Sequence, residues 1–289
     1  MMKNISKKLF HFPMCLAMLC IVASCKKEAV EDRGLTESNL DASFTLTPVA
    51  GKVNTFFAQV KDSSYILSKW DFGNGSVVVG KSSQEVFLPD AGVYTITHYA
   101  VGRGGATFSS SQNVTIATSD PARGNLVKGG KFETADDEAK WTRLTISAPA
   151  VTWTRSNGKM VASGGNWGHS AIYQAITVEA NKDYRFAMQV SGSGATDTWF
   201  EVYFGTAAPV QNSDYSSGGI AIALNTWAGC GNTTFNGNIA TIGCAGALVG
   251  QNGKIRFTQS GTVYLLIKTG GANLGTSGIS IDNVELRGI

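Results

Sequence analysis

Apolar and polar residues alternate along most of the chain from about residue 42 onward, and this two-residue period is the spacing of β-strands. The alternating runs are short, and glycine, asparagine or proline stands between many of them, as at turns between strands. No run of ten residues has the spacing of an amphipathic helix, although 136–140 can form one helical turn. The pattern therefore predicts an all-β protein.

The strands fall into two groups, which predict two β-sandwiches. The first group covers 40–117, a short linker covers 118–124, and the second group covers 125–289. Charged residues make up only 16% of the chain and there are 34 glycines, which suits sheets joined by tight turns better than charge-rich helices.

The first group carries K-W-D-F-G-N-G-S at 69–76 and A-G-V-Y-T-I-T at 91–97. In this order the two motifs resemble the PKD (polycystic kidney disease) domain, an Ig-like β-sandwich. The resemblance implies that Trp70 and Phe72 are core residues. The family commonly has Asp where this chain has Asn74, and either residue suits a turn.

The same region matches the spacing of a phosphate-binding P-loop, G-x-x-x-x-G-K-S, at 75–82. A P-loop needs a helix after it, because the helix N-terminus holds the phosphates. Here a strand-like segment, 83–89, follows instead. We therefore predict no nucleotide site.

The second group opens with N-L-V-K-G-G-K-F-E at 125–133 and closes with I-S-I-D-N-V-E-L at 279–286. Both motifs, in this order, resemble the jelly-roll carbohydrate-binding modules of the family 4/9/22 type, with a galactose-binding-like β-sandwich. The resemblance implies a polysaccharide or oligosaccharide ligand. It also implies that the first and last strands lie side by side.

That arrangement would bring Glu133 close to Asp282. Two carboxylates need a cation or a proton to lie together without repulsion, and oxygen ligands suit Ca²⁺. Because the family often carries a structural calcium there, we expect calcium at this pair. The alternative is two solvated carboxylates at strand ends.

A sugar site needs exposed aromatic rings for the apolar faces of the sugar and polar side chains for its hydroxyls. One strand carries apolar residues on one face, which we assign to the core, and Trp199, Glu201 and Tyr203 on the other. Two loops each hold a tryptophan beside glycine, and a further loop holds a tyrosine. The candidate sugar contacts are Asn166, Trp167, Trp199, Glu201, Tyr203, Tyr215 and Trp227.

Each of these tryptophans has a second interpretation, in which the ring folds back onto the core. Trp141 and Trp153 are the two that we expect to pack inside, since Trp141 matches a core position of the resembled family.

Residues 1–24 have the pattern of an export signal: three lysines, then a short apolar stretch. The segment V-A-S-C that ends at Cys25 resembles a bacterial lipobox, which implies that Cys25 is cleaved and acylated. Residues 25–39 then form a tether, whose acidic residues resemble the surface-export signal of Bacteroidetes lipoproteins. We expect a lipid anchor in the outer membrane, facing the cell surface. The alternative is an ordinary secretory signal with a chance cysteine.

Two cysteines, Cys230 and Cys244, remain in the second group of strands. In an oxidising compartment an isolated pair usually forms a disulfide. Zinc is the alternative, but there is no further cysteine or nearby histidine to complete four ligands.

Charge and motifs narrow the class of function. Without the lysines of the leader, the chain holds 21 basic and 21 acidic residues, so it is a poor nucleic-acid binder. No G-x-S-x-G or H-E-x-x-H motif occurs, although Glu201 with Asp197 or Asp214 remains a possible carboxylate pair.

We therefore expect no enzyme. The whole chain resembles the surface glycan-binding lipoproteins of Bacteroidetes polysaccharide-utilisation systems, which work beside an outer-membrane transporter. The alternatives are a non-enzymatic adhesin or structural surface protein and, less favoured, a polysaccharide-degrading enzyme.

Overall fold

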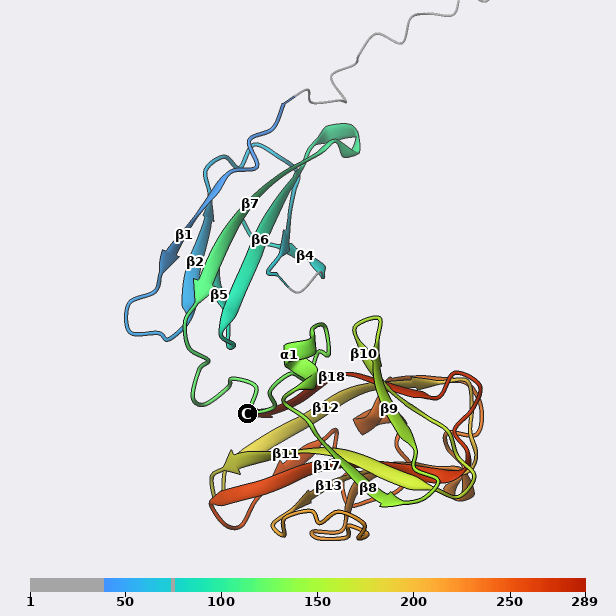
Figure 1. Ribbon diagram of the computed structural model, residues 1–289. Helices are drawn as coiled ribbons and strands as arrows, with labels where there is room; N and C mark the ends of the chain where they lie inside the picture. Colours follow the sequence, from blue (N-terminus) through green and yellow to red (C-terminus); the bar gives the residue numbers. More distant parts are fainter. Residues whose placement is uncertain (1–38, 74–75) are drawn as a thin grey trace, which may run out of the picture.

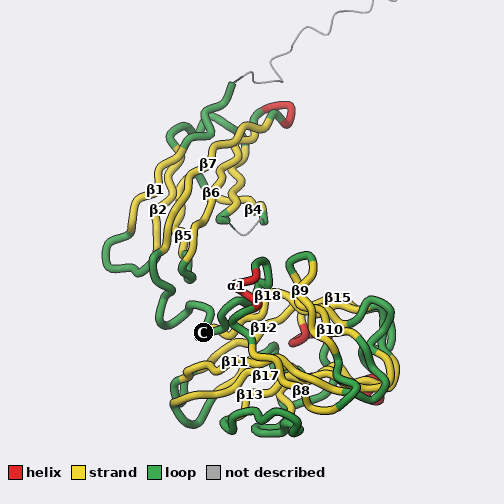
Figure 2. The backbone as a smooth tube through the Cα atoms, in the orientation of Figure 1, coloured by secondary structure: helices red, strands yellow, loops and turns green. Residues whose placement is uncertain are grey.

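The computed structural model describes residues 39–73 and 76–289. The expected signal peptide, Cys25 and all but the last residue of the tether lie outside the described residues, as does Asn74. The regular structure of the described residues is nearly all β, and its strands form two separate sandwiches (Figures 1 and 2). Within the described ranges, no helix is both long enough and apolar enough to cross a membrane.

The N-terminal sandwich packs a three-stranded sheet, in the order β1-β2-β5, against a four-stranded sheet, in the order β4-β3-β6-β7. All of the paired strands are antiparallel. Its elements are β1 (Phe44–Pro48), β2 (Thr55–Val60), β3 (Leu67–Asp71), β4 (Val77–Gly80), β5 (Ser83–Phe87), β6 (Gly92–Val101), a 3₁₀ turn (Arg103–Gly105) and β7 (Thr107–Ile116). This is the Ig-like sandwich that the sequence predicts.

Trp70 is the centre of this sandwich, as expected. It is fully buried and meets the Phe44 ring edge-on at 5.0 Å, and its Nε1 donates to the carbonyl of Lys81. The described part of the P-loop-like spacing runs through β4, and the strand β5 follows it where a P-loop has a helix. Gly80 serves packing, because a Cβ there would lie 2.5 Å from Cδ1 of Trp70.

The C-terminal sandwich is a jelly roll of two antiparallel sheets. The β13 sheet has the order β14-β13-β17-β11-β8, and the β12 sheet has the order β15-β12-β18-β10-β9, with β16 also on β12. The elements are α1 (Ala135–Glu138), β8 (Thr142–Ser147), β9 (Thr152–Ser156), β10 (Lys159–Ser163), β11 (His169–Val178), β12 (Asp183–Gly192), β13 (Thr196–Gly205), β14 (Ile220–Asn225), a 3₁₀ turn (Thr226–Ala228), β15 (Phe235–Asn238), α2 (Ile239–Ile242), β16 (Lys254–Arg256), β17 (Gly261–Asn273) and β18 (Ile279–Gly288).

The core of the jelly roll lies between these sheets and follows the predicted alternation. Phe200, Val202 and Phe204 of β13 are buried in it, and so are Trp141 and Trp153. The opening segment is not a regular strand, but it does lie beside the last one. Its backbone exchanges hydrogen bonds with β18, from the N–H of Leu126 to the carbonyl of Leu286 and from the N–H of Val284 to the carbonyl of Gly130.

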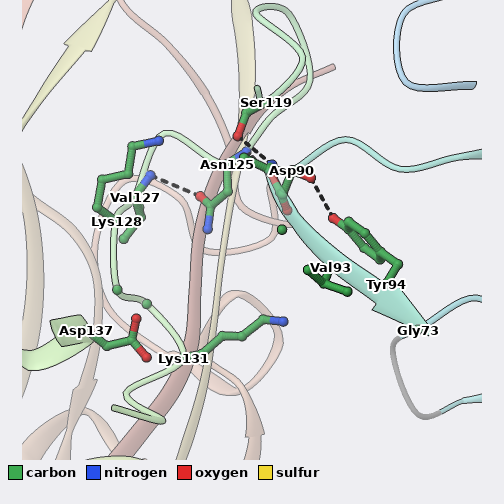
Figure 3. Close-up of a pocket in the computed structure, with 14 residues that line it drawn as sticks. Gly73, Asp90, Val93, Tyr94, Ser119, Asn125, Val127, Lys128, Lys131 and Asp137 are labelled. Atoms are coloured by element: carbon green, nitrogen blue, oxygen red, sulfur yellow. Dashed lines mark hydrogen bonds between the residues drawn. The ribbon is translucent and has the colours of Figure 1, made fainter. Parts of the chain in front are cut away.

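A network of charged and polar groups joins the two sandwiches. Arg287 of β18 binds both carboxylate oxygens of Asp90, at 3.0 and 2.6 Å, and also binds Glu285. The backbone N–H of Asn125 donates to Asp90 as well, at 2.7 Å. Beside this network lies an open cavity of about 410 Å³, lined by both sandwiches (Figure 3). Tyr94, on its rim, donates its hydroxyl to the Asp90 carbonyl.

Candidate functional site

The outer face of the β13 sheet carries a row of residues that crosses all five strands. Residues directly opposite one another in neighbouring strands point to the same side of a sheet. From β14 to β8, this row is Asn225, Trp199, Gly270, His169 and Ser147. We refer to it as the aromatic row.

Trp199 and Trp227 form the centre of the site, and we call them the tryptophan pair. Their ring centroids are 6.1 Å apart with an interplanar angle of 25°, so the rings are nearly parallel and offset. Trp227 is 56% exposed and Trp199 is half-buried. A Cβ on Gly270 would lie 2.9 Å from Cζ2 of Trp199, so the glycine lets the indole lie close to β17. His169 meets the Trp199 ring edge-on at 5.8 Å.

The turn that carries Trp227 is held at both ends. The side-chain oxygen of Asn225 accepts from the backbone N–H groups of Trp227 and Ala228, at 3.0 and 3.2 Å. Cys230 and Cys244 form a disulfide, so the predicted bridge is confirmed and the zinc alternative is excluded. The exposed ring therefore stands on a short, cross-linked segment.

A loop, 206–219, covers the rest of this outer face, and we call it the strap. It leaves β13, reaches β8 at the opposite edge of the sheet and returns to β14; it is the orange loop below the β13 and β8 labels in Figure 1. At β8, the N–H of Asn212 donates to the Thr145 carbonyl at 2.8 Å, and Gln211 bonds the backbone of Thr145 and Arg143.

The strap corrects two of the predicted sugar contacts. Tyr203 and Tyr215 are each only 4% exposed, and they pack with Leu266 in a small core beneath the strap. Their rings meet edge-on at 5.8 Å. The structure therefore buries these two predicted sugar contacts: the strap covers Tyr203, and the Tyr215 side chain turns inward from the strap, where its hydroxyl donates to the Ala207 carbonyl.

Lys268 fixes the strap to the sheet from below. It is 5% exposed, and its Nζ lies 2.9 Å from Oδ1 of Asp214, 3.3 Å from Oε2 of Glu201 and 3.1 Å from the Tyr215 carbonyl. Glu201, itself 8% exposed, also accepts the Tyr203 hydroxyl at 2.7 Å. Glu201 is therefore an internal partner of Lys268 rather than the exposed sugar contact that the sequence predicts.

Asp214, which the sequence suggested only as a carboxylate partner of Glu201, is a binding candidate in the structure. Its side chain is 62% exposed, although Lys268 holds one of its oxygens. Its position beside the aromatic row depends on the path of the strap. The polar run N-S-D-Y around it is the one local signal in the sequence.

The titratable groups of this surface affect one another's pKa values. Burial lowers the pKa of His169, which Asp214 partly opposes, so its imidazole is neutral at pH 7. Partial burial alone would raise the pKa of Asp214, but the hydrogen bond and charge of Lys268 lower it overall. Burial, with the bond to Glu201, raises the pKa of Tyr203 well above its usual value. At neutral pH the exposed acceptor is thus ionised and its neighbouring imidazole uncharged.

Trp167 lies at the same end of the sheet but outside the tryptophan pair. It is 58% exposed, and its N–H donates to the carbonyl of Gly271, next to Gly270 in the aromatic row. Asn166 and Trp167 both have positive φ, 54° and 64°. Within the described residues no other aromatic ring packs against Trp167.

Glu133 and Asp282 interact, as the calcium prediction requires. Burial raises the pKa of Asp282, and the charge of Glu133 raises it further. A half-buried carboxylate beside a second, exposed one is a donor pair that a hard cation fits. Across 39–73 and 76–289 there is no group of three or more His, Cys, Asp or Glu residues placed to hold a metal. Calcium here stays a prediction.

No family model matches the sequence, and no curated protein matches it significantly. Several solved structures are similar in fold. A structure described as showing the promiscuous specificity of carbohydrate-binding modules from the β-sandwich superfamily is 15% identical, covers 85% of this chain and 97% of its own, and has a TM-score of 0.31. A second, described as CBM4 structure and function, is 14% identical, with 56% and 99% coverage and a TM-score of 0.35.

The enzymatically active domain of tailspike protein 4 of bacteriophage CBA120 is 17% identical, covers 57% of this chain and has a TM-score of 0.37. This chain spans 21% of the tailspike chain. At these identities and TM-scores, none of the three carries a function over to this protein.

Proposed function

We propose that this protein binds polysaccharide or oligosaccharide, without catalysis, through the tryptophan pair of its C-terminal jelly roll. The observation that carries the proposal is that Trp199 and Trp227 lie nearly parallel, with one ring exposed on a disulfide-linked turn. A sugar presents an apolar face that packs on such rings, and a rigid aromatic group loses little entropy on binding.

Polar groups beside the pair support the same conclusion. His169 lies edge-on to Trp199, and one of its nitrogens is 3.3 Å from the Ser147 hydroxyl. A neutral imidazole whose neighbour can donate or accept suits sugar hydroxyls, which also do both. Asp214 adds an ionised acceptor.

The carboxylates near the site argue against glycoside hydrolysis. A glycosidase needs one carboxylic acid with a raised pKa to protonate the leaving group. Glu201 and Asp214 both bind the same lysine, and the pKa of Asp214 is lowered. We therefore propose a binding protein.

The remaining parts of the proposal rest on the sequence. Cys25 is the lipidated residue, 25–39 is the tether, and the PKD-like domain, 40–117, is a spacer before the linker and the jelly roll. The protein would then act at the outer-membrane surface beside a glycan transporter. A Cys25→Ala variant should stay unprocessed or become soluble, and normal membrane fractionation of that variant would refute the anchor.

Glu133 and Asp282 would hold a structural calcium in this proposal. The raised pKa of Asp282 supports it, because a divalent cation would relieve the repulsion from Glu133. A chelator should lower the melting temperature of the wild-type protein and leave that of Asp282→Asn unchanged. An identical response of the two proteins argues against the site.

The test of glycan binding is an array of neutral and acidic glycans probed with the purified protein, repeated with Trp227→Ala. Phe57→Ala is a matched control, since Phe57 is an exposed aromatic residue of the N-terminal sandwich. We expect binding by the wild type and the control but not by Trp227→Ala. An array without any hit would contradict the proposal.

An adhesin is the second candidate. The observation that favours it is β4, an edge strand whose three valines, Val77, Val78 and Val79, are 50%, 47% and 66% exposed. Exposed apolar edges attract other chains. Protein binding that is lost in Val79→Lys, together with a blank glycan array, would favour this candidate.

A further inference from the structure

Asp214 stands next to the aromatic row, although it comes from the strap. Lys268 and Glu201 occupy the neighbouring row of the same sheet face, two residues along from Gly270 and Trp199. Two residues of a strand span about 7 Å. Asp214 binds Lys268 at 2.9 Å, and its charge acts on the pKa of His169 in the aromatic row. The carboxylate of Asp214 therefore borders the surface on which a ligand would pack.

Lys268 determines how Asp214 is presented. The buried ammonium holds Oδ1, whereas the side chain as a whole is 62% exposed. The same ammonium binds the Tyr215 carbonyl of the strap and Glu201 of β13, so it ties this part of the strap to the sheet. The carboxylate is thus fixed to the protein by Lys268 and by a hydrogen bond from the backbone of Tyr215, while its 62% exposure leaves room to accept further hydrogen bonds from outside.

The charges along this border leave a net negative site. Asp214 and Glu201 are both carboxylates that bind a single ammonium, that of Lys268, and His169 is neutral. Of these charged groups, the Asp214 carboxylate is the exposed one. A ligand hydroxyl would donate to it in a charge-assisted hydrogen bond, whereas a ligand carboxylate or sulfate would meet like charge.

We propose that Asp214 is the specificity-determining residue of this surface: it accepts hydrogen bonds from hydroxyls of a neutral glycan and repels uronate or sulfated glycans. This inference rests on the proposed glycan binding at the tryptophan pair. In this inference the choice between neutral and anionic glycans depends on one side chain, which the strap places at the edge of the site.

The experiment is affinity electrophoresis of the purified protein in gels that contain one polymer each. The neutral polymers are hydroxyethylcellulose, mixed-linkage β-glucan and galactomannan, and the anionic ones are carboxymethylcellulose, alginate and polygalacturonate. Hydroxyethylcellulose and carboxymethylcellulose share a cellulose backbone and differ in charge. Asp214→Asn, Asp214→Glu and the wild type are compared, with Asp136→Asn as control, because Asp136 is an exposed aspartate of α1.

We expect neutral polymers alone to retard the wild type and the control. Asp214→Asn should bind the neutral polymer about tenfold more weakly, the loss of one charge-assisted hydrogen bond, and should gain retardation by its anionic counterpart. Asp214→Glu keeps the charge and should still reject anionic polymers. A melting curve for each variant separates loss of affinity from loss of fold.

Three results would overturn the inference. Retardation of the wild type by anionic polymers contradicts the role of Asp214 but leaves glycan binding intact. Unchanged affinities in a folded Asp214→Asn variant do the same. No retardation by any of the six polymers removes the proposed function, and this inference with it.

Discussion

The outer face of the β13 sheet has a covered half and an open half, and both are rich in aromatic residues. Tyr203 lies under the strap and packs on Tyr215 of the strap itself, each at 4% exposure, whereas Trp227 is 56% exposed beside Trp199. Trp199 and Tyr203 share the outward face of one strand, β13. Alternation along a strand therefore identifies the side chains that point away from the core, whereas a loop from another part of the chain decides which of them meet solvent.

The covered half should behave as a core. Leu266, fully buried beneath the strap, should cost about 3 kcal/mol of unfolding free energy when replaced by alanine, as in other core truncations. Urea denaturation measures this loss. A cost below about 1 kcal/mol would show that the strap does not pack on the sheet.

The disulfide should matter to both stability and binding in the open half. Replacing Cys230 and Cys244 by serine should lower the unfolding free energy by roughly 3 kcal/mol, because the unfolded chain gains loop freedom. The turn with Trp227 should loosen as well, so glycan affinity should fall in calorimetric titrations. Reduced stability with full affinity would mean that Asn225 alone holds the turn.

Trp227 and Trp167 have nearly the same exposure, 56% and 58%, and should differ in their effect on binding. Trp227→Ala removes half of the tryptophan pair and should weaken glycan binding about tenfold or more, with little change in melting temperature. Trp167→Ala should weaken it less, because no other aromatic ring of the described residues packs against Trp167. Equal losses from both variants would extend the site to the glycine-rich loop.

The halves should also differ in their pH limits. The folded-state pKa of His169 is below its ordinary value of 6.5, so its stabilising contribution is present above that pH and is lost as pH falls. The folded-state pKa of Tyr203 is above 10, so its contribution is lost as pH rises beyond 10. Melting temperatures should be measured from pH 5 to 11. The fall in melting temperature at acid pH should be smaller in His169→Gln than in the wild type, and the fall at alkaline pH should be smaller in Tyr203→Phe. If neither fall changes, the two groups do not govern the pH response.

The site was only partly predictable from the sequence. Trp199 and Trp227 were both candidates, but their contact was not predictable, because 27 residues and the whole strap separate them along the chain. Glu201 was expected to face outward, and it does, yet Lys268 and the strap bury it. Asp214 was named only as a carboxylate partner of Glu201, and its place beside the tryptophan pair was not predictable from the polar run around it.

The sequence by itself determined the β-strands, the buried face of β13 and the cysteine pair. The strands and their buried face follow from the two-residue period of apolar side chains. The disulfide follows from the tendency of an isolated cysteine pair to bridge in an oxidising compartment. Only the tertiary structure decided which outward residues are exposed. The strap reaches Thr145 from position 212, and Lys268 binds Asp214 from another strand. Such contacts depend on the free energy of packing distant segments together, which no local period of the chain encodes.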